Sequence, residues 1–527
     1  MVADMIRDSP FGHIVRLVTR NKVFQYPEEK DPSIAINYYN TEKTRNIARY
    51  GTTTVPEDEN SNNNEKKEKK QESSDDESPK SDARTQRGPD SEQSNNQPAE
   101  QAEVPRHPSD GSVTSGDTQV DMQRQVSNVT GTPVDAERGR DLTVVDWNGP
   151  DDPENPLNWS TAKKFFVTFE ICLLTLGVYI GSAIYTAGIQ DIERQFGVSQ
   201  VAATVGLTLF VAGYGLGPML WSPMSEIPQV GRSPVYMVTL LIFVLFQMPT
   251  AWASNFGMLM AFRFLTGLFG SPVLATGGAT LSDMYVPRKR AYAISIWGMA
   301  AVCGPTLGPL VGGFAAEAKG WQWTIWELTW LSGFAFIMLF FFLPETSSTN
   351  ILYRKTRRLR KLTGNKDLIC EPELQGESMT GKDIAMMVLV RPITLNFQEP
   401  MVFLLNLYIA LIYGLLYIWF ESFPIVFVEI YGFSLGLEGV AFLGIMVGAI
   451  ITIPPYFAYL YYYQEPKFDD QGNIQPEQRL PPAFFGAFCI PICLFWFGWS
   501  AGHTHWIVPI IGSAWFSIGA FCLFNAV

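Results

Sequence analysis

The chain has 527 residues and a formal net charge of −12, with 47% hydrophobic but only 17% charged residues. Residues 1–160 carry 19 Lys or Arg and 30 Asp or Glu, whereas all the residues after them carry 20 and 21. This larger part is too apolar for a soluble domain, because soluble domains have about 25% charged residues. Composition therefore excludes a soluble enzyme and favours a protein that crosses a membrane several times.

The first 160 residues are predicted to be a cytoplasmic, mostly disordered tail. Residues 52–140 are rich in Ser, Asn, Gln and charged side chains and cannot bury enough apolar surface to fold. Ser73 and Ser74 precede acidic residues and Ser127 follows Arg124, so protein kinases are candidate partners of the tail. An unmodified linker explains these serines equally well.

One segment of the tail differs from the rest. Residues 11–22 combine apolar residues at helical spacing with basic residues, namely Phe11, Ile14, Val15, Val18, Arg16, Arg20 and Lys22. This pattern suits a short helix on an anionic membrane surface, which makes membrane lipids a candidate partner. A transient amphipathic segment without a role is the alternative.

Ten runs of about 20 apolar residues follow, each long enough to cross a bilayer. Six come first, at 165–187, 201–221, 235–253, 257–280, 291–315 and 323–343. Four more lie at 399–428, 436–462, 482–500 and 506–525. The predicted fold is an all-α membrane protein with a six-helix N-lobe at 161–343, a cytoplasmic central loop at 344–396 and a partial C-lobe of about four helices at 397–527.

Basic residues in alternate short loops predict a cytoplasmic N-terminus. They lie before the first span, between the second and third, between the fourth and fifth, and after the sixth. The intervening loops carry only Arg194 and Lys319.

No metal and no organic cofactor is predicted. Five of the six cysteines lie in apolar spans and none forms a Cys-x-x-Cys pair. The glycine-rich run 213–218 lies inside a span and follows no strand, and a phosphate-binding Gly-x-x-x-x-Gly-Lys-Ser/Thr loop is absent. An ion gradient, or the gradient of the substrate, is therefore the expected energy source, and nucleic acid is not an expected partner.

The strongest motif lies in the fifth span and is called the Gly-Pro motif below. It consists of Gly298, Gly304, Pro305, Gly308, Pro309, Gly312 and Gly313. Glycines at every fourth position give a helix a smooth face that a neighbouring helix can approach closely. The prolines remove backbone donors and bend the helix. We expect a helix that rocks against a partner.

Arg263 lies in the middle of the fourth span, in the pattern Leu259-x-x-x-Arg263-x-x-x-Gly267. A guanidinium at that depth costs about 2–4 kcal/mol, so we expect it to face a wet cavity and a partner. It cannot carry a proton itself, but it can set the pKa of a carboxylate or bind an anion. Asp283, at the cytoplasmic end of this span, has either a proton or gating role or a plain role at a helix end. Arg263 and Asp283 are the candidates for proton coupling.

Two further acids, Glu170 and Glu327, lie within apolar runs near the two membrane faces. Either could titrate, but snorkelling to the headgroups is the favoured interpretation.

The turn between the second and third spans forms a loop motif. Its residues are Gly217, Ser222, Pro223, Ser225, Glu226, Gly231 and Arg232. A tight turn with an acid and a base on its two sides can latch two helices together.

Aromatic residues are concentrated in the seventh span. Together with one tyrosine of the first span they give the substrate-cavity candidates, which are Tyr179, Tyr408, Tyr413, Tyr417, Trp419, Phe420, Glu421 and Phe423. Aromatics at this spacing often face lipid. Equally, they can line a site for flat cationic or neutral organic compounds.

These motifs together resemble the major facilitator superfamily, in which two six-helix lobes are joined by a long cytoplasmic loop. Other segments resemble its fungal twelve-span drug:proton antiporters, most closely the benomyl/fluconazole multidrug-resistance permeases. They are 7–9, 27–29, 152–159, 275–278, 344–346, 351–355 and 420–424. The resemblance implies a secondary active transporter, not an enzyme, that uses protons to export diverse small-molecule drugs by alternating access. It also implies the plasma membrane, rather than the vacuole, and a need for Arg263 in coupling.

Two alternatives stay open. A nutrient facilitator or symporter is disfavoured by the antiporter-type Gly-Pro motif and by the absence of Ser-Pro-Arg after Pro344-Glu345. The second is a truncated, non-transporting product, because the partial C-lobe lacks two helices that would mirror spans five and six. In relatives, one of these missing helices partly holds the loop motif.

Overall fold

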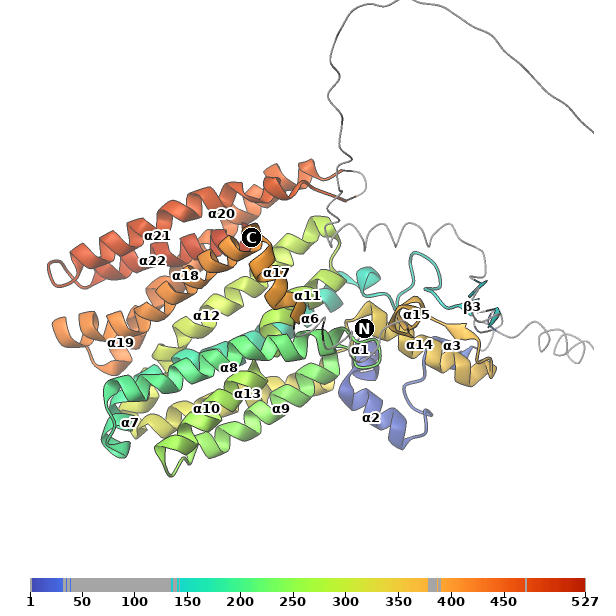
Figure 1. Cartoon of the computed structure of the whole chain (residues 1–527), viewed down its shortest axis with the longest axis horizontal. Coiled ribbons are helices and arrows are strands. Elements are labelled where there is room, and N and C mark those ends of the chain that lie inside the picture. The colour runs from blue at the N-terminus through green and yellow to red at the C-terminus, as the bar shows by residue number, and fades with distance from the viewer. Residues whose placement is uncertain are drawn as a thin grey trace, which may run out of the picture. The chain divides into compact units, whose positions relative to one another are not determined.

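The computed structural model describes residues 2–31, 35, 38, 134–135, 140–141, 143–377, 386, 390–469 and 472–526. Within them, ten helical segments are long and apolar enough to cross a membrane (Figure 1). Six precede residue 344 and four follow residue 399, as the hydrophobic runs predict. Nearly all of the predicted disordered stretch 52–140, with Ser73, Ser74 and Ser127, lies outside the described residues.

The first half of the bundle contains the six earlier spans. Its helices are α6 (Thr161–Ala183), α7 (Ile189–Phe196), α8 (Gln200–Glu226), α9 (Arg232–Ala251), α10 (Phe256–Gly270), α11 (Pro272–Met284), α12 (Pro287–Lys319) and α13 (Trp321–Phe342). The fourth span is interrupted between α10 and α11 because Pro272 has no N–H to continue the ladder. α10 packs between α8 and α9, and α6 packs against α12 and α13.

The second half contains α18 (Pro400–Phe423), α19 (Leu435–Ala441), α20 (Leu443–Tyr459), α21 (Pro481–Ser500) and α22 (Ile507–Ala526). α18 continues into a π-helical turn at Pro424–Ile430. The core of the second half is aromatic, with Phe423, Phe427, Phe442 and Phe497 packed together. α12 contacts α19, α20 and α22, so this one helix of the first half joins the two halves.

Several further elements lie at one end of the bundle, where α6, α9 and α12 begin. They are α1 (Val2–Asp8), α2 (Pro10–Val18), α3 (Pro27–Lys30), α14 (Ser348–Thr363), α15 (Glu371–Glu377) and α17 (Arg391–Gln398). Strand β3 (Thr143–Val144) pairs in parallel with β4 (Leu368–Ile369), and β1 (Val134–Asp135) pairs antiparallel with β2 (Arg140–Asp141). We call this end the α14 end.

Both ends of the predicted tail differ from the expectation. Residues 2–31 and 143–160 are folded and pack against α13 and α14, as Figure 1 shows. The central loop expected at 344–396 likewise contains helices. Composition missed these segments because their few apolar residues and their charges find partners in other parts of the chain, which a local window does not register.

Candidate functional site

Arg263 of α10 is completely buried. Its Nε donates to the carbonyl of Gly206 in α8 at 3.2 Å, and its Nη1 donates to the carbonyl of Gly181 in α6 at 3.0 Å. The rings of Tyr185 and Phe210 each lie 4.5 Å from the guanidinium carbon. Carbonyl dipoles and ring faces therefore stabilise this cation.

The partners of Arg263 differ in kind from those expected. Among the described residues it makes no ion pair, and its Nη2 has no hydrogen-bond partner. A buried donor without a partner costs about 1–3 kcal/mol. The group is thus a fixed positive charge with one N–H direction free for an incoming acceptor.

Phenol groups from three helices form a cluster, and one of them, Tyr417, lies near this charge. Tyr179 of α6 and Tyr214 of α8 pack edge to face, with ring centroids 5.1 Å apart. From α18, Tyr413 lies within electrostatic range of Tyr179, and Tyr417 lies within range of Arg263. The hydroxyls of Tyr179 and Tyr214 are buried without hydrogen-bond partners. The structure therefore groups Tyr179 and Tyr214 of the first half with Tyr413 of the second, and it places Tyr417 near Arg263.

The other candidates of the seventh span are not grouped around Arg263. Trp419, Phe420 and Phe423 are at most 3% exposed and lie in the aromatic core of the second half. Trp419 packs edge to face on Phe497, with centroids 4.6 Å apart. Their assignment to a substrate cavity stays a prediction, because spacing within α18 does not reveal which face α21 covers. Tyr408 and Glu421 are partly buried, and one carboxylate oxygen of Glu421 has no partner.

The Gly-Pro motif of α12 packs closely against α6. A methyl group on Gly304 would lie 2.6 Å from Cβ of Tyr179. On Gly308 it would lie 2.8 Å from Cβ of Ala183, and on Gly312 2.7 Å from the Ile184 carbonyl. Only glycine allows helices this close.

The two ends of the Gly-Pro motif behave differently. Gly313 faces the Leu435 backbone of α19 in the second half, and Gly439 of α19 faces the carbonyl of Pro309. α12 is thus closely packed on both halves. By contrast, Gly298, which begins the motif, has open space around it in the described structure and does not belong to the close-packed face.

The loop motif is organised around an ion pair. Arg232, the first residue of α9, contacts Asp283 near the end of α11, with 2.7 Å between Nη1 and Oδ2. Gly217 has no room for a side chain because the hydroxyl of Ser271 lies beside it, and Ser225 donates to the carbonyl of Ser222 at 2.6 Å. Arg232, predicted to form a latch, and Asp283, predicted to act in gating, therefore contact each other.

The predicted acid of the latch, Glu226, is exposed and forms no ion pair among the described residues. The acid that contacts the loop motif is instead Glu345, which follows α13. The Glu345 carboxylate accepts four backbone N–H groups at 3.0–3.3 Å, those of Arg232, Ser233, Thr346 and Ser347. A carboxylate at the start of α9 satisfies free donors and complements the helix dipole.

Two residues beside Glu345 complete its grip on the loop motif. Gly231 has φ +79°, and a Cβ there would lie 2.6 Å from the Glu345 carboxylate, so both conformation and space require glycine. Asn350 of α14 donates to the carbonyl of Pro228 at 2.6 Å. The loop motif is therefore held by residues 345–350 in this structure. Sequence reasoning missed Glu345 as a site residue, although Pro344-Glu345-Thr346 was a recognisable segment.

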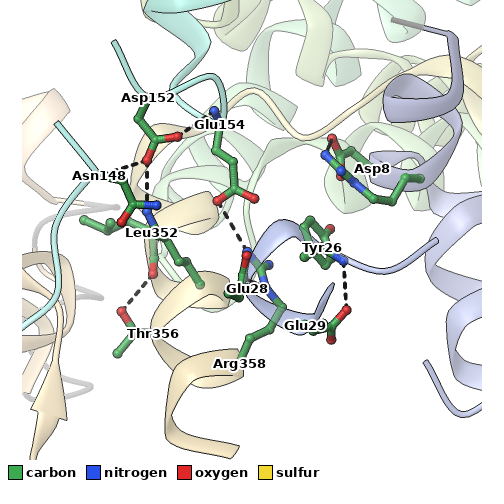
Figure 2. Close-up of polar contacts among 12 residues, drawn as sticks. Asp8, Tyr26, Glu28, Glu29, Asn148, Asp152, Glu154, Leu352, Thr356 and Arg358 are labelled. Atoms are coloured by element: carbon green, nitrogen blue, oxygen red, sulfur yellow. Dashed lines mark hydrogen bonds and ion pairs between the residues drawn. The ribbon is translucent and has the colours of Figure 1, made fainter. Parts of the chain in front are cut away.

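A polar clamp fixes α14 to the segment before α6 (Figure 2). Lys355 of α14 contacts Asp152 at 3.0 Å, and both side chains are 2% exposed. Asp152 also accepts the N–H groups of Asn148 and Glu154. Burial opposes ionisation of Asp152, but these hydrogen bonds and the Lys355 charge outweigh it and lower its pKa.

The two intramembrane acids have different surroundings. Glu170 of α6 is 0% exposed and neither carboxylate oxygen has a hydrogen-bond partner in the described part of the chain, so the snorkelling interpretation is wrong for it. Glu327 of α13 is partly exposed and lines a cavity of about 400 Å³ with Ile184 and Trp330. A buried ionised carboxylate without a partner is very costly, which favours the neutral, protonated form of Glu170.

Comparison with known proteins gives consistent matches. The family model described as Major Facilitator Superfamily matches residues 171–527. "Transporter mfs1" of Schizosaccharomyces pombe is 46% identical over 387 residues, covering 73% of each chain. The "Cycloheximide resistance protein" of Candida maltosa is 43% identical, covering 72% of this chain and 70% of its own. "Fluconazole resistance protein 1" of Saccharomyces cerevisiae is also 43% identical, covering 72% of this chain and 69% of its own.

Proposed function

Because this chain belongs to the Major Facilitator Superfamily, we propose that it exports small organic compounds, antifungal drugs among them, in exchange for protons. The names of two relatives, which refer to cycloheximide and fluconazole resistance, support the substrate class. The observation that carries the proposal is the buried Arg263, which has one N–H without a partner among the described residues and lies near Tyr185 of the first half and Tyr417 of the second. A charge and aromatic surfaces together suit compounds that combine flat rings with polar acceptors.

The helix packing supports alternating access. One half rocks against the other around a central site in this superfamily. α12 is the element through which such rocking would act, because Gly313 and Pro309 lie directly on α19 of the second half, while Gly304 and Gly308 fix α12 to α6 of its own half. Two helices whose backbones lie in direct contact can move past each other without large rearrangements of side chains.

Two acids are suited to proton exchange. Glu170 is buried without a partner, so it is expected to hold a proton until water reaches it. Asp283 pairs with Arg232 at the α14 end, and protonation of Asp283 would remove the attraction that holds α11 to α9.

The orientation follows from the charges at the α14 end. Short connections there carry most of the basic residues, namely Lys163, Lys164, Arg232, Arg288, Lys289, Arg290 and those of α14. The positive-inside rule then puts this end and the N-terminus in the cytoplasm. The plasma membrane is the proposed location, because export from the cell requires it.

The test is drug susceptibility and efflux in a pump-deficient yeast that expresses the chain. We expect resistance to cycloheximide or fluconazole and drug efflux that a protonophore stops. Efflux that continues unchanged after the proton gradient collapses would contradict proton coupling. Protonophore-sensitive uptake of a sugar without drug efflux would instead favour a nutrient symporter.

A further inference from the structure

Helix α2 has one face packed on the protein and one face without a partner in the described chain. Gly12 and Arg16 are buried, and His13 is half-buried. On the other side, Ile14 is 50% exposed, Leu17 80% and Val18 76%. Large apolar side chains this exposed and this close together need an explanation, because they form a patch rather than scattered single residues.

The position of this patch relative to the membrane follows from Phe11. Two helical turns separate Phe11 from Val18, so the two side chains lie on the same side of α2. The Phe11 ring packs on α13, with centroids 4.9 Å from Phe341 and 6.2 Å from Phe340. The patch is therefore continuous with the surface of a membrane-spanning helix.

The face of α13 that Phe11 meets is its outward face. Trp330, Phe334, Ile337 and Phe341 recur every three or four residues and are 57%, 54%, 56% and 37% exposed. Such a stripe on a membrane-spanning helix faces lipid. It ends at Phe341, where α13 ends and α2 begins to cover it, so α2 lies at the edge of the bilayer.

α2 is held firmly in this place, which argues against a transient segment. Arg16 contacts both carboxylate oxygens of Glu29, at 2.7 and 2.9 Å, and donates to the carbonyl of Phe24. Arg358 of α14 contacts Glu28 and lies 3.6 Å above the ring of Tyr26 (Figure 2). The sequence pattern counted Arg16 among residues for the lipid surface, but this ion pair occupies it.

Two cations remain for the headgroups. Arg20 and Lys22 follow the apolar patch directly and are exposed. The chain turns there through left-handed conformations at Arg20 and Asn21, with φ of 51° and 61°. This turn presents both charges beside Leu17 and Val18. An apolar stripe flanked by cations is the pattern of helices that lie in the headgroup region of anionic membranes.

We propose that α2 is an interfacial anchor: Ile14, Leu17 and Val18 insert into the leaflet at the α14 end, and Arg20 and Lys22 bind anionic lipid headgroups there. The occupant is the lipid surface and not a protein, because the patch continues the lipid-facing stripe of α13. With the orientation proposed above, this leaflet is the cytoplasmic one, whose anionic lipids include phosphatidylserine.

The test uses the full-length protein reconstituted in vesicles, with a photo-crosslinking amino acid in place of Leu17. Lys30 of α3, which is exposed but lies outside the patch, provides the matched control position. After irradiation, mass spectrometry is expected to find lipid adducts at position 17 and several-fold fewer at position 30. Equal labelling at the two positions, or adducts at 17 only with protein, would overturn the proposal.

The charges are tested in the same assay. Arg20→Glu combined with Lys22→Glu is expected to lower the lipid adduct at position 17 several-fold in vesicles of phosphatidylcholine and phosphatidylserine. Much less change is expected in phosphatidylcholine alone, because zwitterionic headgroups offer no net charge. An equal loss in both lipids would show that the variant has unfolded α2 or that the cations have no lipid role, and either result counts against the proposal. The readout does not involve transport, so it succeeds or fails independently of the proposed function.

Discussion

The two halves of the bundle bury different chemistry. The first half encloses a buried arginine, a buried glutamate without a partner and the Arg232–Asp283 pair. The second half also buries Glu438, but its core consists of rings, with Phe423 lying 4.1 Å from Phe442 and 5.5 Å from Phe497 between centroids. Charged groups in a membrane are costly and are retained where they act, whereas aromatic packing only requires volume. This difference suits the proposed coupling role of the first half and a supporting role of the second, with α18 contributing Tyr413 and Tyr417.

The largest expected effect comes from the buried cation. Arg263→Ala is expected to abolish drug efflux, because it removes the charge and leaves the Gly206 and Gly181 carbonyls without donors. Arg263→Lys should recover little, since a tetrahedral ammonium lacks the planar fork that packs on Tyr185 and Phe210 while donating to both carbonyls. Efflux normalised to surface protein measures both variants. Normal proton-dependent efflux by the alanine variant would contradict the proposal that the first half couples transport to protons.

The next effect concerns α12 and includes its own control. Gly308→Leu is expected to remove most transport, since even a methyl group would lie 2.8 Å from Ala183. Gly308→Ala should be milder, and Gly298→Leu should be nearly neutral because that position is open. Transport rate per surface molecule is the readout. If the leucine variants at 298 and 308 are equally active, the close contact between α12 and α6 is not needed for transport.

A smaller loss is expected at the start of α9. Glu345→Gln weakens four backbone hydrogen bonds and a favourable helix-dipole contact, which is a loss of roughly 1–2 kcal/mol. Its melting temperature in detergent should fall by a few degrees. The exposed Glu226→Gln provides the matched control and should leave melting unchanged. A larger fall in melting temperature for Glu226→Gln than for Glu345→Gln would favour the sequence prediction, in which Glu226 is the acid of the latch.

The aromatic residues of α18 should separate into two classes. Trp419→Phe is expected to lower thermal stability and leave the relative resistance to different drugs unchanged, because Trp419 lies in the core of the second half. Tyr417→Phe should keep stability and alter the drug profile, since Tyr417 lies near Arg263. Resistance to a drug panel together with melting curves distinguishes them. A changed drug profile for Trp419→Phe would instead indicate that Trp419 lines the substrate cavity.

The smallest effect is a pH dependence at the α14 end. Burial, followed by the Arg354 charge, lowers the pKa of His13 to about 4. Neutral His13 accepts from Arg354 at 2.7 Å. When α2 is detached from the protein, the His13 imidazole binds a proton near pH 6.5, whereas in the packed helix it stays neutral down to about pH 4. Acid therefore favours the detached helix, and the packing of α2 weakens as the pH falls from about 6.5 towards 4. Hydrogen exchange in 10–18, corrected for intrinsic rates, should rise on acidification, and His13→Gln should abolish the change. Identical pH responses of the two proteins would exclude His13 as the cause.

The sequence predicted the ten spans well because long apolar runs are a local property that does not depend on the rest of the fold. It also identified Arg263 and the glycines at 304, 308 and 312, because charge at membrane depth and four-residue spacing are visible in one helix. These positions are the ones at which the structure brings α6, α8 and α12 together.

What the sequence missed depends on contacts between distant segments. Glu345 lies 113 residues from Arg232, and no local pattern links them. The same holds for Asp152 and Lys355, which are 203 residues apart. Trp419 and Tyr417 are two positions apart on one helix, yet one packs in the second half and the other near Arg263. Helical spacing alone cannot state which neighbour each face meets.

Proton-driven export through a site built on Arg263 is tested most directly with purified protein in sealed vesicles under an imposed pH gradient. The account predicts that the wild-type protein moves a labelled drug against its concentration gradient, that this stops when the pH gradient is collapsed, and that Arg263→Ala shows neither. Drug movement that only equilibrates concentrations, at the same rate with and without the pH gradient, would contradict it.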